Sequence, residues 1–347
     1  MRNDCSGKIN LIWSFIRTKC GALNGGGLNR GVLLTCMVIA IVGSCFAKAF
    51  SEPADAETPG MVVRQVLPSN TAGAIDTFSG ADFQHWVWYS PTAIDRHQLL
   101  VFLPGTGGKG KGSGKFNKAA ANCGYHVVSL AYPDAISISK FRNSDDPSAF
   151  SKARMNVIAG AAPYGRLQVN RANSIENRLI ALLRYLAKQY PREHWEQFLD
   201  AHQNPTWDKL VLAGQSQGGG HACFIAIKMH KVARVLMFGA PKDYNLHFDK
   251  PGQWLSQESV TPINRFFCFN HSDDSHNGCT YQQQVRNYRA LGLLPTYKVF
   301  NVDVAAPPFE HTRLLTSTVQ QDEPHGAPVH DPRYKPVWMY MLLEPVE

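Results

Sequence analysis

The chain has 347 residues, of which 44% are hydrophobic and 18% are charged, a balance typical of globular proteins that excludes disordered and fibrous chains. Its formal charge of +8 is concentrated at the front, because residues 1–49 hold six basic residues and one acidic residue. The remaining 29 basic and 26 acidic residues leave a net charge of +3 without a convincing basic stripe, so the composition does not favour nucleic-acid binding.

Residues 1–49 are predicted to be a targeting segment. Arg30 precedes an apolar run at 32–46, and the small residues Ala47 and Ala49 follow it at the spacing of a signal-peptidase site. The run is shorter than the roughly 20 residues of a membrane span, which favours a cleaved signal and a secreted or periplasmic protein. An uncleaved membrane anchor and a lipoprotein acylated at Cys45 are the alternatives.

Residues 50–80 are rich in Ala, Pro, Gly and Thr and are predicted to be a linker or a loose N-terminal arm. From residue 81 to 347, strand and helix patterns alternate, which predicts one α/β domain with a mostly parallel sheet and helices on both faces. The strands are expected at 83–90, 98–104, 126–133, 209–214, 233–240, 263–270 and 296–303. The helices are expected at 116–122, 173–190, 218–230, 280–291 and 334–342.

Three local features refine this pattern. Asn173 and Glu176 have the spacing of a capping box at the start of the clearest helix. Two long segments, 134–172 and 241–261, exceed ordinary loop lengths and are expected to form the walls or lid of a pocket. Cys268 and Cys279 bracket a short polar loop, so they are the pair we expect if an exported protein forms a disulfide.

The strongest motif is Gly214-Gln215-Ser216-Gln217-Gly218, which has the pattern G-x-S-x-G. The apolar strand LVLAG leads into it and the apolar helix HACFIAIKM leads out of it. A sharp turn between a strand and a helix lifts a serine hydroxyl above the sheet and places it at a helix N-terminus, where developing negative charge is favoured. The motif therefore predicts that Ser216 is a nucleophile; a glycine-rich structural turn is the alternative.

From these residues onward the chain resembles the α/β-hydrolase superfamily, over about Phe83 to Leu343. The stretch GQSQGGGHACFIAIKMHKVARVLMFGAP is similar to lipases and esterases with Gly-Ala-Pro after the next strand, although Gln215 and Gln217 replace commoner neighbours. The resemblance implies an α/β-hydrolase fold and a serine, acid, histidine order along the chain. It implies no cofactor.

The acid is expected in the loop after strand 263–270, where Asp273 fits best and Asp274 is the alternative. The base is expected near the C-terminus, and His325 in a His-Gly pair is preferred over His330 and His311. Asp303 is a further candidate for a displaced acid.

The Gly-rich loop after strand 98–104 matches neither common nucleotide-binding pattern, and we expect it to supply an oxyanion hole. The backbone N–H groups of Thr106 and Gln217 are the expected donors. His271 and His276 with Asp273 and Asp274 have no common zinc spacing, so no metal is predicted.

These residues predict a serine hydrolase that cleaves carboxylic esters of small molecules or lipids through an acyl-enzyme on Ser216. An acyltransferase using the same residues and a catalytically silent binding protein on the same fold are the alternatives. The N-terminal segment also allows membrane association.

Overall fold

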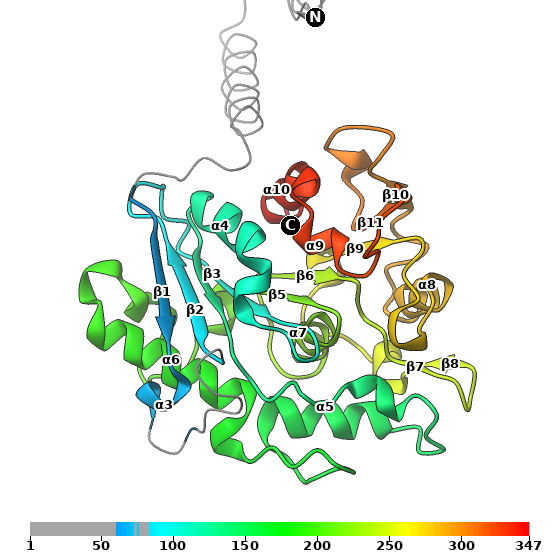
Figure 1. Cartoon of the computed structure of the whole chain (residues 1–347), viewed down its shortest axis with the longest axis horizontal. Coiled ribbons are helices and arrows are strands. Elements are labelled where there is room, and N and C mark those ends of the chain that lie inside the picture. Colours follow the sequence, from blue (N-terminus) through cyan, green and yellow to red (C-terminus); the bar gives the residue numbers. More distant parts are fainter. Residues whose placement is uncertain (1–59, 73–74, 76–82, 347) are drawn as a thin grey trace, which may run out of the picture. The chain divides into compact units, whose positions relative to one another are not determined.

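The computed structural model describes residues 60–72, 75 and 83–346, and a nine-stranded sheet forms its centre (Figure 1). The strands of this sheet are Val62–Val66 (β1), His85–Tyr89 (β2), Leu99–Leu103 (β3), His126–Ser129 (β4), Leu210–Gln215 (β5), Arg234–Phe238 (β6), Phe266–His271 (β9), Val299–Asn301 (β10) and Leu314–Ser317 (β11). Their spatial order is β1-β2-β4-β3-β5-β6-β9-β11-β10. β2 runs antiparallel to β1 and β4, and the other pairings are parallel, which confirms the predicted mostly parallel sheet.

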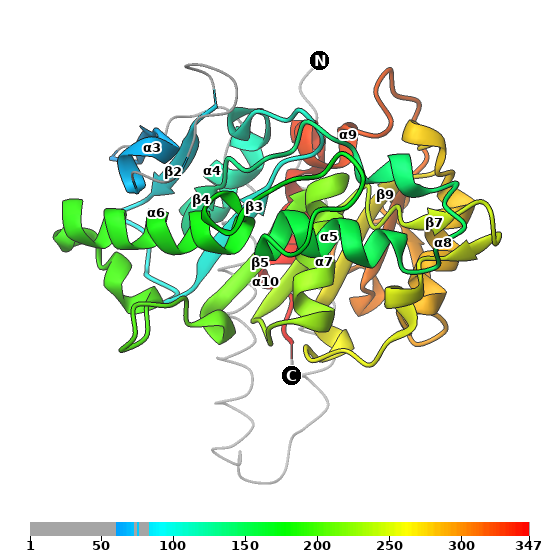
Figure 2. The same cartoon turned by 90° about the horizontal axis from the view of Figure 1, so that it is seen from below.

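Helices cover both faces of the sheet (Figure 2). They are Pro68–Thr71 (α3), Gly114–Asn122 (α4), Ala149–Ala159 (α5), Ile175–Gln189 (α6), Gln217–Lys228 (α7), Tyr281–Ala290 (α8), Ala327–His330 (α9) and Lys335–Leu343 (α10). Successive residues of a strand point to opposite faces, so Leu210 and Leu212 pack against α5, α6 and α7. Val211 and Ala213 pack on the other face, with α4 and α10. Two hydrophobic cores therefore hold the central strands from both sides.

A second, two-stranded sheet pairs Tyr244–Asn245 (β7) with Lys250–Pro251 (β8), within the segment after β6. The segments that follow β3, β5, β6, β9 and β11 all leave the large sheet at its carboxyl edge, because these strands are parallel. That edge is where ligands bind in open α/β sheets. The fold thus gathers the loops that carry the predicted site residues at one edge.

The prediction that residues 50–80 are a linker is wrong for 62–71. Val62–Val66 pairs along its whole length with β2, and Pro68–Thr71 forms the short helix α3. The three valines and the alternation of partly buried and exposed positions fit a strand at the edge of the sheet, but the Pro- and Gly-rich surroundings concealed this pattern. The α/β unit accordingly begins before residue 81.

Helices α5 and α6 differ from the sequence-based expectation. Ser174 caps α6 by accepting the amide N–H of Asn177, at 3.3 Å, so the expected capping box of Asn173 and Glu176 is wrong. The carboxylate of Glu176 instead bonds His230 and Arg171. Helix α5 lies inside the long segment 134–172, where no helix was predicted.

The expected disulfide between Cys268 and Cys279 is also not present. All four cysteines among the described residues are free, and both members of this pair are buried. Cys268 lies in the middle of β9, where its side chain joins the hydrophobic core. Packing in the core therefore accounts for this cysteine.

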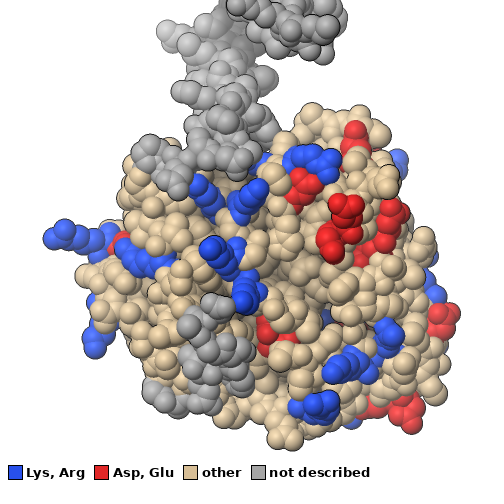
Figure 3. Space-filling model, viewed as in Figure 1, with Lys and Arg blue, Asp and Glu red and all other residues tan. Residues whose placement is uncertain are grey.

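The predicted targeting segment, residues 1–49, lies outside the described residues. None of the helices in 60–72 and 83–346 combines the length and the hydropathy that a bilayer span requires. On the face shown in Figure 3, basic residues gather over α4 and acidic residues over the side of β10 and β11, so neither sign of charge covers the whole face.

Candidate active site

Ser216 lies on a strained turn between β5 and α7. Its backbone has φ 55° and ψ −118°, a conformation that a residue with a side chain adopts at a cost. The Ser216 N–H donates to the carbonyl of Phe238 at the end of β6, at 2.8 Å, which ties the turn to the neighbouring strand. The geometry is the strand–turn–helix that the G-x-S-x-G motif predicts.

Close backbone approach explains two glycines of the motif. A Cβ at Gly214 would collide with the backbone of Gly218 and Gly219, on the other side of the turn. A Cβ at Gly218 would collide with the carbonyl oxygens of Leu103 and Pro104, at the end of β3. The turn can therefore pack against β3 only when these positions carry no side chain.

His325 lies between β11 and α9, and its imidazole lies beside Gly239, next to the strand end that bonds the serine turn. A Cβ at Gly239 would be 3.0 Å from the imidazole Cε1 and Nδ1 atoms, and Gly239 directly follows Phe238. The Gln215 side chain donates to the carbonyl of His325 at 3.4 Å. The imidazole Nε2 is buried and has no hydrogen-bond partner among the described residues.

The carboxylate that contacts His325 belongs to Asp274, and the preference for Asp273 is wrong. Asp274 Oδ2 lies 2.9 Å from Nδ1 of His325, whereas the Asp273 side chain is 65% exposed and bonds its neighbour Ser272. β9 extends one residue beyond the predicted strand, to His271, and the turn after it directs Asp274 inward. Asp274 was the alternative that the sequence left open.

Asp274 is fully buried and accepts hydrogen bonds on both oxygens. Oδ2 accepts from His325 and from the Gln284 side chain at 3.1 Å, while Oδ1 accepts from Lys242 Nζ at 2.8 Å and from the His276 amide at 3.0 Å. Burial raises the pKa of Asp274, but bonding to His325 and the charges of His325 and Lys242 outweigh it and hold the pKa well below its usual range.

A second imidazole covers His325. The rings of His276 and His325 stack with centroids 4.4 Å apart and an angle of 5° between their planes. Burial and the positive charges of His325 and Lys242 lower the pKa of His276. The neutral ring of His276 can therefore shield the outer side of His325 without competing for Asp274.

The other candidate residues lie elsewhere. His311 precedes β11 at the opposite end of that strand and bonds Glu344 at 2.6 Å. His330 is in α9, where burial lowers its pKa and the backbone of Gly112 bonds its ring. Asp303 accepts a hydrogen bond from Ser317 at 2.9 Å, at the β10 side of β11. None of these three contacts Asp274 in the hydrogen bonds of the described residues.

The two residues expected in an oxyanion hole are in contact through their side chains. Thr106 Oγ1 donates to Gln217 Oε1 at 2.9 Å, and the amide of Ile138 donates to the same oxygen at 2.9 Å. α7 begins at Gln217, so its first N–H groups have no acceptor within the helix. A Cβ at Gly105 would lie 3.3 Å from Cβ of Ser216, which places the Thr106 loop beside the serine.

A buried ion pair that the sequence did not indicate supports the turn. Arg154 of α5 donates to Asp243 at 2.7 Å and to the carbonyl of Gln217 at 3.3 Å, and both members of the pair are buried. Asp243 also accepts the indole N–H of Trp254 at 2.8 Å. Arg154 occupies the space that a side chain at Gly220 would need, which explains the third glycine after Gln217.

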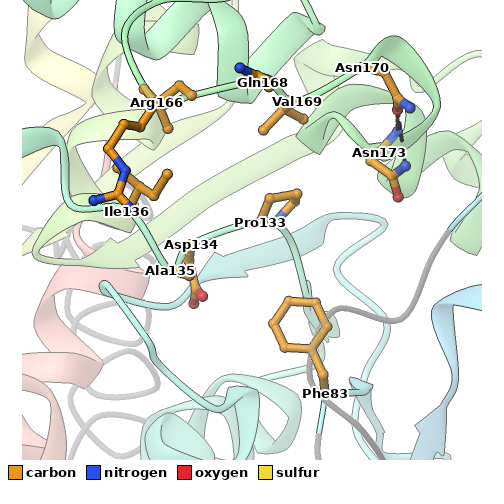
Figure 4. Close-up of a pocket in the computed structure, with 11 residues that line it drawn as sticks. Phe83, Pro133, Asp134, Ala135, Ile136, Arg166, Gln168, Val169, Asn170 and Asn173 are labelled. Carbon is orange, nitrogen blue, oxygen red and sulfur yellow. Dashed lines mark hydrogen bonds between the residues drawn. The ribbon is translucent and has the colours of Figure 1, made fainter.

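A cavity of about 360 Å³ lies between Phe83 and the two ends of the segment 134–172 (Figure 4). Its walls come from the two ends of the segment 134–172, with Phe83 opposite them, as expected for a pocket wall. The lining residues are Phe83, Pro133, Asp134, Ala135, Ile136, Arg166, Leu167, Gln168, Val169, Asn170 and Asn173. The Asp134 carbonyl accepts the Gly107 N–H at 3.2 Å, so this cavity adjoins the loop that approaches Ser216.

Asp134 is the acidic residue in the lining of this cavity, and the sequence analysis missed it. Burial raises the pKa of its carboxyl group to about 7, although the backbone N–H groups of Gly107 and Gly108 lower it in part. The sequence offered only one signal for it, its place directly after the predicted strand 126–133 at the start of the long segment.

Within the described residues, no group of three or more His, Cys, Asp or Glu side chains is arranged to hold a metal ion. The His271 ring bonds the Val319 carbonyl at 2.7 Å and the Asp273 amide at 3.1 Å, so both of its nitrogens have protein partners. The polar cluster after β9 is therefore organised around Asp274 and His325.

The sheet order, the single reversed strand β2 and the strained serine between β5 and α7 define an α/β-hydrolase fold. The resemblance found in the sequence is thus confirmed at the level of the fold. The fold alone does not identify the reaction.

No family model matches this sequence, and no curated protein matches it. Among solved structures, it is similar to a phosphonate-inhibited esterase B from Lactobacillus rhamnosis, with 12% identity, a TM-score of 0.43, and 91% of this chain and 94% of that chain covered. It is also similar to a bacterial heroin esterase, with 12% identity, a TM-score of 0.42, and 90% and 91% covered.

Proposed function

We propose that this protein is a serine hydrolase that cleaves carboxylic esters through an acyl-enzyme on Ser216. The observation that carries the proposal is the state of His325. One imidazole nitrogen bonds the buried carboxylate of Asp274, and the other is buried without a hydrogen-bond partner among the described residues. The ring lies beside Gly239, and Gln215 of the serine turn bonds the carbonyl of His325. A base held in this way needs a proton donor on its free side, and a serine hydroxyl is the group that such a base activates.

In the first step, Nε2 of His325 takes the proton of Ser216 Oγ while that oxygen attacks the ester carbonyl carbon. The tetrahedral oxyanion is stabilised by the backbone N–H groups of Thr106 and Gln217. The imidazolium then donates its proton to the departing alcohol oxygen, which leaves the acyl group on Ser216. Asp274 stays ionised and holds the imidazole with its proton on Nδ1.

In the second step, water enters on the alcohol side and gives a proton to His325 as its oxygen attacks the acyl carbon. The carbonyl is re-formed, Ser216 recovers its proton from His325, and the carboxylic acid is released. An alcohol in place of water would make the same residues an acyltransferase, so product analysis with a competing alcohol separates the two reactions.

Active-site labelling tests the proposal directly. A fluorophosphonate probe reacts only with an activated serine, so we expect wild-type protein to be labelled and Ser216→Ala to remain unlabelled. Ser216→Ala should also lower ester hydrolysis by about 10⁴-fold or more. Ser272→Ala is the matched control, because Ser272 lies beside the acid loop and should retain labelling. An unlabelled wild-type protein would instead support the silent binding protein.

We further propose export through residues 1–49, with cleavage after Ala49 or nearby. Expression of the full-length chain, followed by fractionation and N-terminal sequencing, distinguishes a cleaved secreted form from an uncleaved anchor. Recovery of the intact N-terminus in the membrane fraction would contradict cleavage and support the anchor. Acylation at Cys45 would leave that residue as the mature N-terminus.

A further inference from the structure

Asp274 bridges two cationic groups instead of serving only His325. Lys242 follows β6, and its side chain, 9% exposed, brings Nζ to 2.8 Å from Asp274 Oδ1. His325 occupies the other carboxylate oxygen at 2.9 Å, and Asp274 itself has no exposed side-chain surface. To activate the serine, a triad requires only the acid and the imidazole. The reaction therefore does not explain why the Lys242 ammonium bonds the same carboxylate.

The position of this ammonium has an electrostatic consequence. A buried carboxylate stabilises the protonated form of its histidine partner, which delays the appearance of the neutral base as the pH rises. A lysine on the same carboxylate offsets its negative charge and repels the imidazolium. The pair is almost enclosed, so neither water nor salt screens these interactions as they would on the surface.

The other charged and titratable groups nearby come from four segments. The β9–α8 segment supplies His276, with its lowered pKa, the exposed Asp273, and Cys279, whose thiol pKa burial raises to about 12. The segment before α9 supplies Glu323, which acts on His276, and α9 supplies His330, whose burial lowers its pKa. Beside Lys242, Asp243 is already paired with Arg154.

We propose that Lys242 is a positioning residue that fixes the Asp274 carboxylate and keeps His325 available as a neutral base at lower pH than Asp274 alone would allow. This inference rests on the proposed function, because it concerns the base that activates Ser216. It assigns Lys242 no contact with substrate. Its effect is transmitted through one carboxylate, from Oδ1 to Oδ2.

The test is the pH dependence of kcat/KM for ester hydrolysis in Lys242→Met and Lys242→Gln. Both variants remove the charge, and Gln retains an N–H donor for Asp274 if the Met variant does not fold. We expect the acid limb of the profile to move up by about one pH unit, which is about a tenfold loss of kcat/KM below the limb. At the alkaline plateau we expect less than about a threefold change.

Two further variants control for charge and for packing. Lys242→Arg retains a cation at Asp274 and should keep the acid limb near its wild-type position. Lys231→Met removes an equal charge from an exposed position before β6 and should leave the limb unchanged. The rate of fluorophosphonate labelling against pH gives the same limb without substrate turnover.

If Lys242→Met and Lys242→Gln lose activity equally at all pH values, without a shift of the acid limb, the inference is overturned and Lys242 is a structural residue. The inference is also overturned if both variants keep full activity and the acid limb does not shift. In both cases wild-type labelling and hydrolysis would stand, so the proposed function would survive. A wild-type protein that neither labels nor hydrolyses esters would overturn both proposals.

Discussion

Lys242 and Asp243 are adjacent in the chain, yet each belongs to a different buried ion pair. Lys242 bonds Asp274 on the side of His325, and Asp243 bonds Arg154 on the side of α5 and α7. Both pairs are nearly closed to solvent, and both lie at the carboxyl edge of the sheet. Burial and pairing alone therefore do not reveal what an ion pair does.

The groups that each pair contacts make the difference. In the Arg154–Asp243 pair, Arg154 donates to the carbonyl of Gln217 and Asp243 accepts from the indole of Trp254. This pair therefore connects the backbone of the serine turn with the core. The Lys242–Asp274 pair shares its carboxylate with an imidazole whose other nitrogen has no hydrogen-bond partner among the described residues. We therefore expect disruption of the Arg154 pair to act mainly on stability, and disruption of the Asp274 pair to act mainly on chemistry.

The largest expected effect comes from removing the shared carboxylate charge. Asp274→Asn should lower kcat by about 10⁴-fold, because an amide cannot stabilise the imidazolium or hold the imidazole proton on Nδ1. Asp273→Asn is its matched control, one residue earlier and largely exposed, and should change kcat by less than about twofold. Steady-state kinetics of the two variants decides between the neighbouring acids. A loss confined to Asp273→Asn would reverse the assignment.

The uncertainty between these two residues shows where sequence reasoning ends. The serine turn could be predicted because its strand, glycines and helix are contiguous, and each is required by local geometry. The acid depends on the register of a single turn, and β9 ends one residue later than the predicted strand 263–270. One residue of register decides which side chain faces inward.

Other parts of the site were hidden for different reasons. β11 has only four residues, half of them Thr or Ser, so its sequence has no strong strand pattern. It nevertheless leads to His325, which the sequence order did identify. Lys242, Arg154 and Asp134 belong to no motif, and their partners lie far away in the chain. Contacts of that kind arise only after the sheet has assembled.

The second prediction concerns stability. Arg154→Met removes one member of the pair that supports the serine turn, and it leaves Asp243 buried without its cation. Breaking a buried pair in this way should lower the free energy of unfolding by about 3–5 kcal/mol. Chemical denaturation monitored by fluorescence measures this loss.

Lys242→Met serves as the comparison in the same assay. The bond from His325 and the two remaining N–H donors still hold Asp274, so we expect a smaller loss of stability than for Arg154→Met. If Lys242→Met were the more destabilising of the two, the proposed division between structure and chemistry would be wrong.

Asp134 is a third buried carboxyl group, and it extends the comparison. Backbone N–H groups stabilise its charged form, whereas Asp243 and Asp274 are each paired with a cation. The Asp134 pKa of about 7 is above the value of an unfolded chain, so the folded state binds the extra proton. Stability from this group is therefore greatest below about pH 4 and falls as the pH rises to about 7.

Asp134→Asn keeps the shape but cannot ionise, so it should remove this fall and leave the protein about 1–3 kcal/mol more stable than wild type at pH 8. At pH 4 the two proteins should unfold at similar denaturant concentrations. Denaturation midpoints measured from pH 4 to 8 provide the test, and a constant difference across that range would assign the effect to packing. If the stability of wild type falls with pH relative to that of Asp134→Asn, ionisation of Asp134 destabilises the folded protein. Asp134 would then differ from Asp274, whose negative charge is paired with Lys242.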